Sequence, residues 1–246
     1  MKNDRYFLVI NVFLLSVVLI GFAPSFFLRP TSGLKPLPLY MILHGISCTA
    51  WVIAIVLQSY WIQKRRLIPH RKMGLYFSLI APVVYVSGLM VLSYAVGQYH
   101  VDFSPISAGA EVPEPQSFKA LILTGDLIQI SLFLAFVWIG YRRRNRADIH
   151  KRAMLIATIL LCQQALVRLG KIDFLIIGSE PGASGALYAT LVPFLLLVSM
   201  LMYDWRKVGK PTRISWGGMG GFFFLLVASF GLKASGLAVE ILEGFR

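Results

Sequence analysis

The sequence predicts an all-α integral membrane bundle of seven transmembrane helices, in a single domain covering 1–246. Two observations predict it. Seven stretches are long and apolar enough to cross a bilayer, which takes about 20 apolar residues per helix. Lys and Arg gather in alternate gaps between these stretches. Composition agrees, because 57% of the residues are hydrophobic and 14% are charged, whereas soluble domains carry about 25% charged residues.

The predicted spans follow one another with short links and leave no room for a second, soluble domain. In chain order they are 6–28, 38–62, 73–97, 117–141, 153–177, 185–203 and 216–241.

The first two spans are distinguished by their length and by one polar face. Span 6–28 follows a basic start and exceeds the roughly 7–15-residue apolar core of a cleaved signal peptide, so we expect a retained helix. On span 38–62, the helical repeat of about 100° per residue aligns several polar and aromatic side chains. That face carries His44, Cys48, Trp51 and Gln58.

The next three spans differ in their charges. Span 73–97 is apolar and begins directly after a basic link. Span 117–141 contains Asp126, and span 153–177 contains Arg168. Charged residues inside lipid are costly and usually face the interior of a bundle or a cavity.

The last two spans are identified by hydropathy and by small residues. Span 185–203 is continuously apolar. Span 216–241 begins with Gly217 and Gly221 at the four-residue spacing that permits close approach of two membrane helices. Both are therefore expected to complete the bundle.

The basic gaps predict the orientation of the chain. Five Lys or Arg residues lie in 63–72, six in 142–152 and four in 204–215, whereas the opposite gaps hold few. The positive-inside rule then places the N-terminus in the cytoplasm and the C-terminus outside. We expect a multi-pass protein of the bacterial inner (plasma) membrane. The net charge of +13 is explained by these rows facing anionic lipid headgroups, so no nucleic-acid partner is expected.

The longest link, 98–116, is proline-rich and contains no Lys or Arg. It is expected to lie outside, either as a cap or gate over the outer face or as a plain connector.

A short internal repeat precedes two of the spans. Residues 66–74 and 146–154 both read Arg, three residues, His, two basic residues and then the start of a span. Helices 2–3 and 4–5 are therefore predicted to be two parallel copies of one helical hairpin.

Three helices place polar side chains in one outer layer. His44 lies about 9 Å from the outer end of its helix, and Asp126 and Arg168 lie about 14 Å deep. An ion pair between Asp126 and Arg168 is expected, either as part of a site or as a lock between two helices. His44 and Cys48, four residues apart, are candidate ligands for a soft metal or else a satisfied bundle pair.

The inner layer holds a second candidate site. His70 and His150 occupy equivalent positions of the repeat, so they are expected at the same depth on helices 3 and 5. Two facing histidines can be the axial ligands of a b-type haem, and the neighbouring basic residues suit its propionates. The alternative is that both histidines are interfacial residues that contact lipid phosphate or cap the turns.

A set of residues in the middle of the chain carries a family resemblance: Leu43-His44-Gly45, Trp51, Gln58, His70-Arg71, Gly74, Asp126, His150-Lys151-Arg152 and Met154. With these residues the chain resembles an uncharacterised family of bacterial polytopic membrane proteins. The resemblance covers helices 2 to 5 and implies the topology and the choice of residues, without an activity. A weaker likeness is to the ascorbate-reducible transmembrane b-type cytochromes, which implies at most one haem here, because Asp126 stands where a second outer histidine is expected.

Three functions remain open from the sequence. The first is a haem- or metal-binding redox protein for electron transport, with His70 and His150 as ligands. The second is a transporter or small-molecule binder that uses the layer of His44, Asp126 and Arg168. The third is an accessory subunit for assembling a larger membrane complex.

Overall fold

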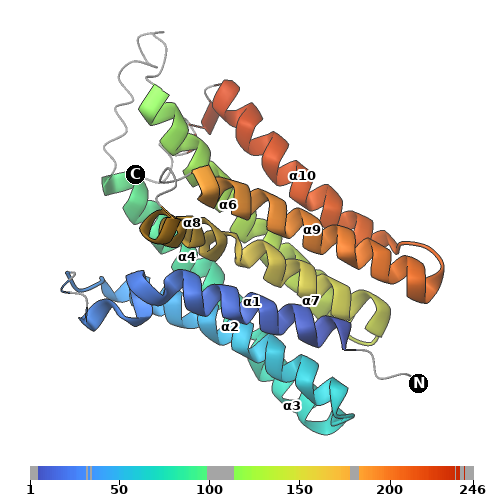
Figure 1. Ribbon diagram of the computed structural model, residues 1–246. Coiled ribbons are helices and arrows are strands. Elements are labelled where there is room, and N and C mark those ends of the chain that lie inside the picture. Colours follow the sequence, from blue (N-terminus) through green and yellow to red (C-terminus); the bar gives the residue numbers. More distant parts are fainter. Residues whose placement is uncertain are drawn as a thin grey trace.

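The computed structural model describes residues 5–31, 33, 35–98, 114–177, 183–235, 237–238 and 241. Throughout this part the chain forms helices and no strand, and seven helical segments are long and apolar enough to span a membrane. The prediction of an all-α, seven-span integral membrane bundle is thereby confirmed (Figure 1). The helices are α1 (Tyr6–Phe22), η1 (Ala23–Phe27), η2 (Arg29–Thr31), α2 (Leu39–Gln63), α3 (Leu67–Ser78), α4 (Ile80–Gln98), α6 (Glu114–Arg142), α7 (Ala147–Leu161), α8 (Gln163–Ile177), α9 (Ala183–Val208) and α10 (Arg213–Ala234).

Two spans begin earlier than their hydropathy predicts. Helices α3 and α7 start at Leu67 and Ala147, six residues before the predicted starts at 73 and 153. Each start contains a histidine followed by two basic residues, which interrupts the apolar pattern although the backbone is already helical. His70 and His150 therefore lie in the first turns of helices rather than in links.

The fifth span is the centre of the bundle. In its most apolar window 67% of the residues are buried, against 22–39% in the other six spans. Its first half, α7, packs against α6, α10, α1, α2 and α9, whereas its second half, α8, packs mainly against α9 and α1. A buried hydrogen bond from Trp51 Nε1 to Thr158 Oγ1, 3.2 Å long, ties α2 to this central helix.

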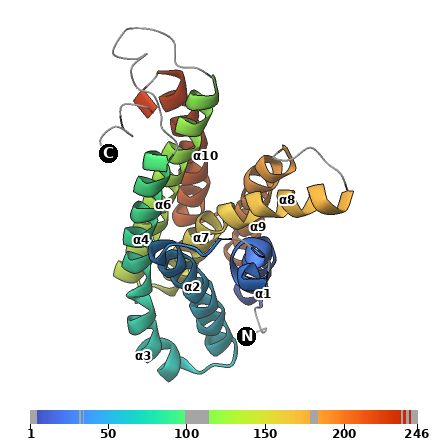
Figure 2. The ribbon, with the colours of Figure 1, turned by 90° about the vertical axis from the view of Figure 1, so that its left-hand side faces the viewer.

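The central span is broken at Cys162, between α7 and α8. The two views show that α8 turns sharply away from the axis of α7 (Figures 1 and 2). The third span is also interrupted, at Leu79 between α3 and α4. The break at Leu79 precedes Pro82, which has no N–H to donate to the carbonyl of Ser78. No proline or glycine follows Cys162 within one turn, so the break in the central span carries no such mark in the sequence.

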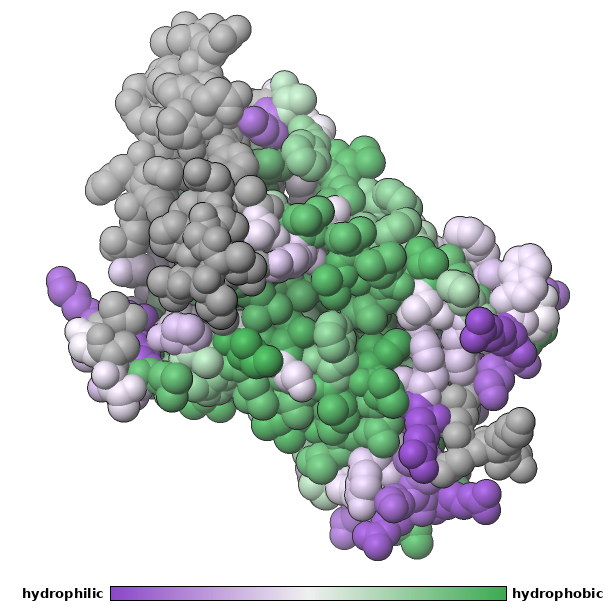
Figure 3. All heavy atoms as spheres, in the orientation of Figure 1, coloured by the Kyte–Doolittle hydropathy of each residue, from purple (hydrophilic) through white to green (hydrophobic). Residues whose placement is uncertain are grey.

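The surface of the bundle separates into an apolar band and one strongly basic end. Hydrophilic side chains gather where α2 meets α3, α6 meets α7 and α9 meets α10, and an apolar belt covers the helices beyond them (Figure 3). We call this the basic end. The side of the membrane that it faces and the proposed internal repeat stay predictions. Residues 99–113 of the expected outer cap lie outside the described part of the chain.

Candidate functional site

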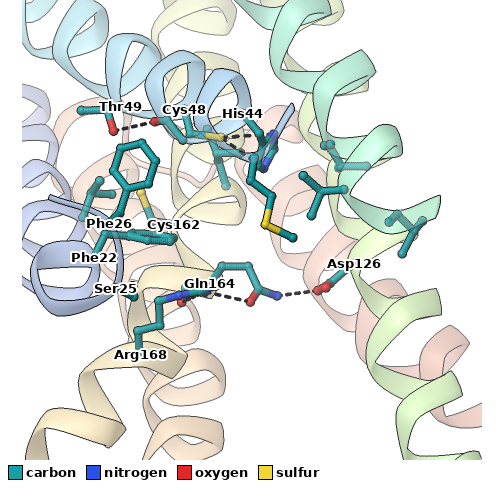
Figure 4. Close-up of a pocket in the computed structure, with 18 of the residues that line it drawn as sticks. Phe22, Ser25, Phe26, His44, Cys48, Thr49, Asp126, Cys162, Gln164 and Arg168 are labelled. Carbon is teal, nitrogen blue, oxygen red and sulfur yellow. Dashed lines mark hydrogen bonds between the residues drawn. The ribbon is translucent and has the colours of Figure 1, made fainter. Parts of the chain in front are cut away.

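A cavity of about 350 Å³ lies in the half of the bundle away from the basic end. Its walls come from α1, η1, η2, α2, α4, α6 and both halves of the broken central span (Figure 4). Apolar side chains form most of these walls, as in ordinary small-molecule pockets of roughly 300–1,000 Å³. The polar and cysteine lining residues are Ser25, Arg29, His44, Cys48, Thr49, Asp126, Gln129, Cys162, Gln164 and Arg168.

The three residues predicted to share an outer layer all line this cavity. His44 comes from α2, Asp126 from α6 and Arg168 from α8. Figure 4 shows His44 on one side and the pair Asp126 and Arg168 on another. The structure thus brings the predicted layer together, although its functional role is not thereby established.

Asp126 and Arg168 are joined through Gln164 rather than by the expected direct ion pair. Gln164 Nε2 donates to Asp126 Oδ1 at 2.5 Å. Arg168 Nη1 donates to the carbonyl of Gln164 at 3.0 Å and to its Oε1 at 3.4 Å. Gln164 lies one turn before Arg168 on α8, so its amide can take the position between the two charges.

The Arg168 guanidinium also packs on an aromatic ring. Its central carbon lies 4.4 Å from the centre of the Phe22 ring, a distance typical of a cation–π contact. Within the described part of the chain, both hydrogen bonds of Arg168 come from Nη1. Nε and Nη2 therefore have no acceptor among the described residues.

His44 is held in one orientation by α4. The hydroxyl of Ser87 donates its hydrogen to Val83 O at 2.6 Å, so its oxygen accepts a hydrogen bond from His44 Nδ1–H at 3.1 Å. Nε2 is then the unprotonated nitrogen, and the Cys48 thiol lies 3.5 Å from it. A Cβ at Gly88 would collide with Ile130 Cδ1 and would lie 3.2 Å from His44 Cε1, so the glycine makes room for both side chains.

His44 and Cys48 are in contact, as their spacing predicts, but they do not complete a metal site. Tetrahedral metal sites use four ligands, at least three of them from the protein. In the parts of the chain that the structure describes, no group of three His, Cys, Asp or Glu residues could hold an ion. Metal binding at His44 and Cys48 stays a prediction.

The break in the central helix lies in the cavity wall. Leu161, Cys162 and Gln164 all line the cavity. The last carbonyls of a helix lack intrahelical donors, and at this end Gln129 Nε2 donates to Leu160 O at 2.9 Å. The break is thus stabilised by α6, which also supplies Asp126.

A second arginine and an unpartnered hydroxyl lie near the end of α1. Arg29 Nε donates to Lys35 O at 2.7 Å, and Nη1 donates to Ser25 O at 3.2 Å. The hydroxyl of Ser25 is buried without a hydrogen-bond partner in the structure. This part of the cavity therefore offers positive charge and a polar atom that a ligand could satisfy.

The predicted haem ligands also meet, near the basic end. The rings of His70 and His150 are 6.2 Å apart between centres and are inclined by 78°. His150 Nδ1 donates to Gly140 O at 2.9 Å, which leaves Nε2 as the available nitrogen. The side-chain amide of Gln58 forms hydrogen bonds through both polar atoms in one orientation. In that orientation its nitrogen donates to His70 Nδ1 at 2.5 Å, and its oxygen accepts from Gly74 N at 3.2 Å. His70 Nε2 then carries the proton.

One buried network was missed by sequence reasoning. Arg152 and Asp204 form an ion pair at the basic end, and their side chains are 2% and 0% exposed. The position of Arg152 in the basic link 142–152 predicts an exposed side chain, and Asp204 lies at the start of the basic link 204–215. The one signal was that Asp204 is the sole acidic residue of that link, followed by Thr212 and Ser215, which can both donate to it.

No protein-family model, curated protein or solved structure matches this chain.

Proposed function

We propose that the chain is a membrane protein that binds a small amphipathic molecule with an anionic group in the cavity of His44, Asp126 and Arg168. The observation that carries the proposal is the convergence of polar side chains from three separate spans on one mostly apolar cavity. Burying charged side chains in a membrane bundle is costly, and such residues usually mark substrate or ion pathways. An apolar ligand body suits the walls, and a polar head suits the charged side.

The charges of the cavity favour an anionic head. Arg29 and Arg168 contribute two positive charges, whereas Asp126 contributes one negative charge. The carboxylate of Asp126 already accepts a hydrogen bond from Gln164. Arg168 has unused donors on Nε and Nη2 within the described structure. A planar guanidinium with two free donors is well suited to a carboxylate.

The interruption at Cys162 favours transport as the use of this binding. Secondary transporters often hold their substrates where membrane helices are discontinuous. Here the broken central span and the π-helical turn η1, which contains Pro24, both border the cavity. Flux of the bound molecule in proteoliposomes is the corresponding assay.

The test uses decanoate as the probe, with decylamine and decanol as partners of equal chain length. Binding to the purified protein is measured by calorimetry and by the shift in melting temperature. We expect decanoate to bind most tightly. Arg168→Gln is expected to weaken it by about 10- to 100-fold, because hydrogen bonds to charged groups contribute about 1.5–3 kcal/mol.

Arg206→Gln is the matched control, since Arg206 is exposed at the basic end. It should leave decanoate binding unchanged. Equal binding of the acid, the amine and the alcohol, or equal losses in both variants, would refute the anionic site.

A second candidate is a haem or metal centre at His70 and His150, favoured by the 6.2 Å approach of their rings. The hydrogen bond of His150 to a backbone carbonyl is the arrangement that metal-binding histidines commonly show. His70 could bind the iron through Nε2 only if the Gln58 amide reverses, because Nε2 of His70 otherwise carries a proton. The hollow between α3, α4 and α6 has neither histidine in its lining.

A visible absorption spectrum distinguishes this candidate from the first. Protein purified from cells supplied with haem should show a Soret band that His150→Ala abolishes. An absent band would reject the haem version and leave the anion-binding proposal untouched.

A further inference from the structure

A second hollow lies on the outside of the bundle, between the third span and α6. It has a volume of about 600 Å³ and is almost entirely apolar. Its two serines offer no open donors, because Ser78 Oγ donates to Leu75 O at 2.6 Å and Ser131 Oγ donates to Leu127 O at 2.8 Å. We call it the α4–α6 groove. Its lining is Leu75, Ser78, Leu79, Ala81, Pro82, Tyr85, Ser131, Leu134, Ala135, Val137, Trp138 and Tyr141.

The length of the groove matches one leaflet of a bilayer. Its lining extends over eleven residues on each side, from Leu75 to Tyr85 and from Ser131 to Tyr141. The ten helical steps between the first and the last of them span about 15 Å. The hydrocarbon core of a bilayer is about 30 Å thick, so half of it is also about 15 Å. A single acyl chain therefore has the right chemistry and the right length.

Cations stand at the end of the groove that is nearest the basic end. The Arg142 guanidinium lies 5.4 Å from the ring centre of Trp138, and that of Arg144 lies 4.8 Å from the ring centre of Tyr141. Both rings line the groove. The aromatic side chains thus hold two guanidinium groups next to the groove opening.

The opposite wall adds two more cations. Arg71 and Lys72 are exposed on α3, four and three residues before Leu75, which lines the groove. Side chains at these spacings share one face of a helix. No acidic residue lines the groove within the described part of the chain. Positive charge therefore surrounds one end of an otherwise apolar channel.

From this juxtaposition we infer that the α4–α6 groove is a binding site for an anionic phospholipid. One acyl chain lies along the groove, and the phosphate lies among Arg142, Arg144 and the cations of α3. Trp138 and Tyr141 lie where aromatic residues commonly mark the membrane–water interface. The site is distinct from general attraction of lipids to a basic surface, because it joins a shaped apolar channel to the cations.

Native mass spectrometry of the full-length protein in mild detergent tests the inference. Phosphatidylglycerol and phosphatidylcholine with identical acyl chains are added in equal amounts. We expect one phosphatidylglycerol to be retained per protein in preference to phosphatidylcholine. Arg142→Gln with Arg144→Gln should weaken that retention by about 30-fold, since each cation near a lipid headgroup contributes about fivefold.

Two controls separate the groove from bulk charge. Arg206→Gln with Lys207→Gln removes two exposed cations from α9 at the same end, and it should leave retention unchanged. Ala135→Phe fills the groove and should reduce retention of both lipids. The inference is wrong if the α9 pair lowers retention as much as the α6 pair, or if the two lipids are retained equally.

Discussion

The bundle contains two buried charged networks, and they are built in opposite ways. At the basic end, Asp204 accepts from Arg152 Nε and Nη2, from Thr212 N and Oγ1, and from Ser215 Oγ. In the other half, among the described residues, Asp126 accepts one hydrogen bond, from Gln164. In the first network every guanidinium nitrogen and both carboxylate oxygens have a hydrogen-bond partner, whereas in the second Nε and Nη2 of Arg168 have none among the described residues.

The difference separates a structural network from the site that we propose for ligand binding. The Arg152 network joins α7, α9 and α10 directly, and Arg152 Nη1 also donates to Asp148 O at 2.6 Å. Such closed networks contribute to a unique fold but can do nothing further with a ligand. Within the described part of the chain the Asp126 network leaves donors of Arg168 without acceptors, which is the property that the proposed binding site requires.

The largest expected effect comes from breaking the closed network. Arg152→Gln or Asp204→Asn should each reduce the free energy of unfolding by about 3–5 kcal/mol, because each leaves a buried charge without its partner. Thermal unfolding and folded yield in detergent measure the loss. The double variant Arg152→Met with Asp204→Leu should recover most of it. If each single change costs no more than Arg206→Gln at the exposed surface, the network is not buried as described.

A smaller effect is expected in the open network. Asp126→Asn or Arg168→Gln should cost about 1–3 kcal/mol, since Gln164 and Phe22 still partly surround the remaining group. The double variant should be less costly than the sum, by about 0.5–3 kcal/mol of coupling.

The position of Gln164 provides a sharper test of the same network. Gln164→Leu should abolish the coupling between Asp126 and Arg168, because it removes the amide that joins them. A double-mutant cycle in the Gln164→Leu background measures this. Unchanged coupling would mean that the two charges interact directly.

The smallest effect is expected at His44. Ser87→Ala removes the acceptor of His44 Nδ1 and should cost about 1 kcal/mol of stability, the usual contribution of one hydrogen bond. Decanoate binding should change less than in Arg168→Gln, because Ser87 orients the ring but carries no charge. A larger loss of binding in Ser87→Ala would place His44, not Arg168, at the centre of the site.

Hydropathy and charge were sufficient to predict the spans and the layer that His44, Asp126 and Arg168 share. These signals depend on composition over many residues, and the bilayer makes them strong. They do not report where a helix is interrupted. The segment around Cys162 is apolar, and its break is satisfied by Gln129, a side chain from another helix. Such a partner is visible only once the helices are packed.

The sequence also could not predict which buried polar side chains form hydrogen bonds with one another. Depth arguments predicted that Asp126 and Arg168 would meet, but the amide between them depends on the rotation of α8 relative to α6. The burial of Arg152 could not be predicted either, because a basic residue beside His150 and Lys151 is expected at the surface. Its burial depends on α9 ending beside α10, where Gly209 adopts a left-handed conformation and closes the helix.

The interruption at Cys162 divides the central span into two helices that meet at a bend. The buried ion pair of Arg152 and Asp204 holds α7 at the basic end, so it opposes movement of that helix. Arg168 lies about 9 Å from the bend along α8. A small rotation of α8 about this bend would therefore displace the Arg168 guanidinium and change the size of the cavity, while the helices at the basic end keep their positions.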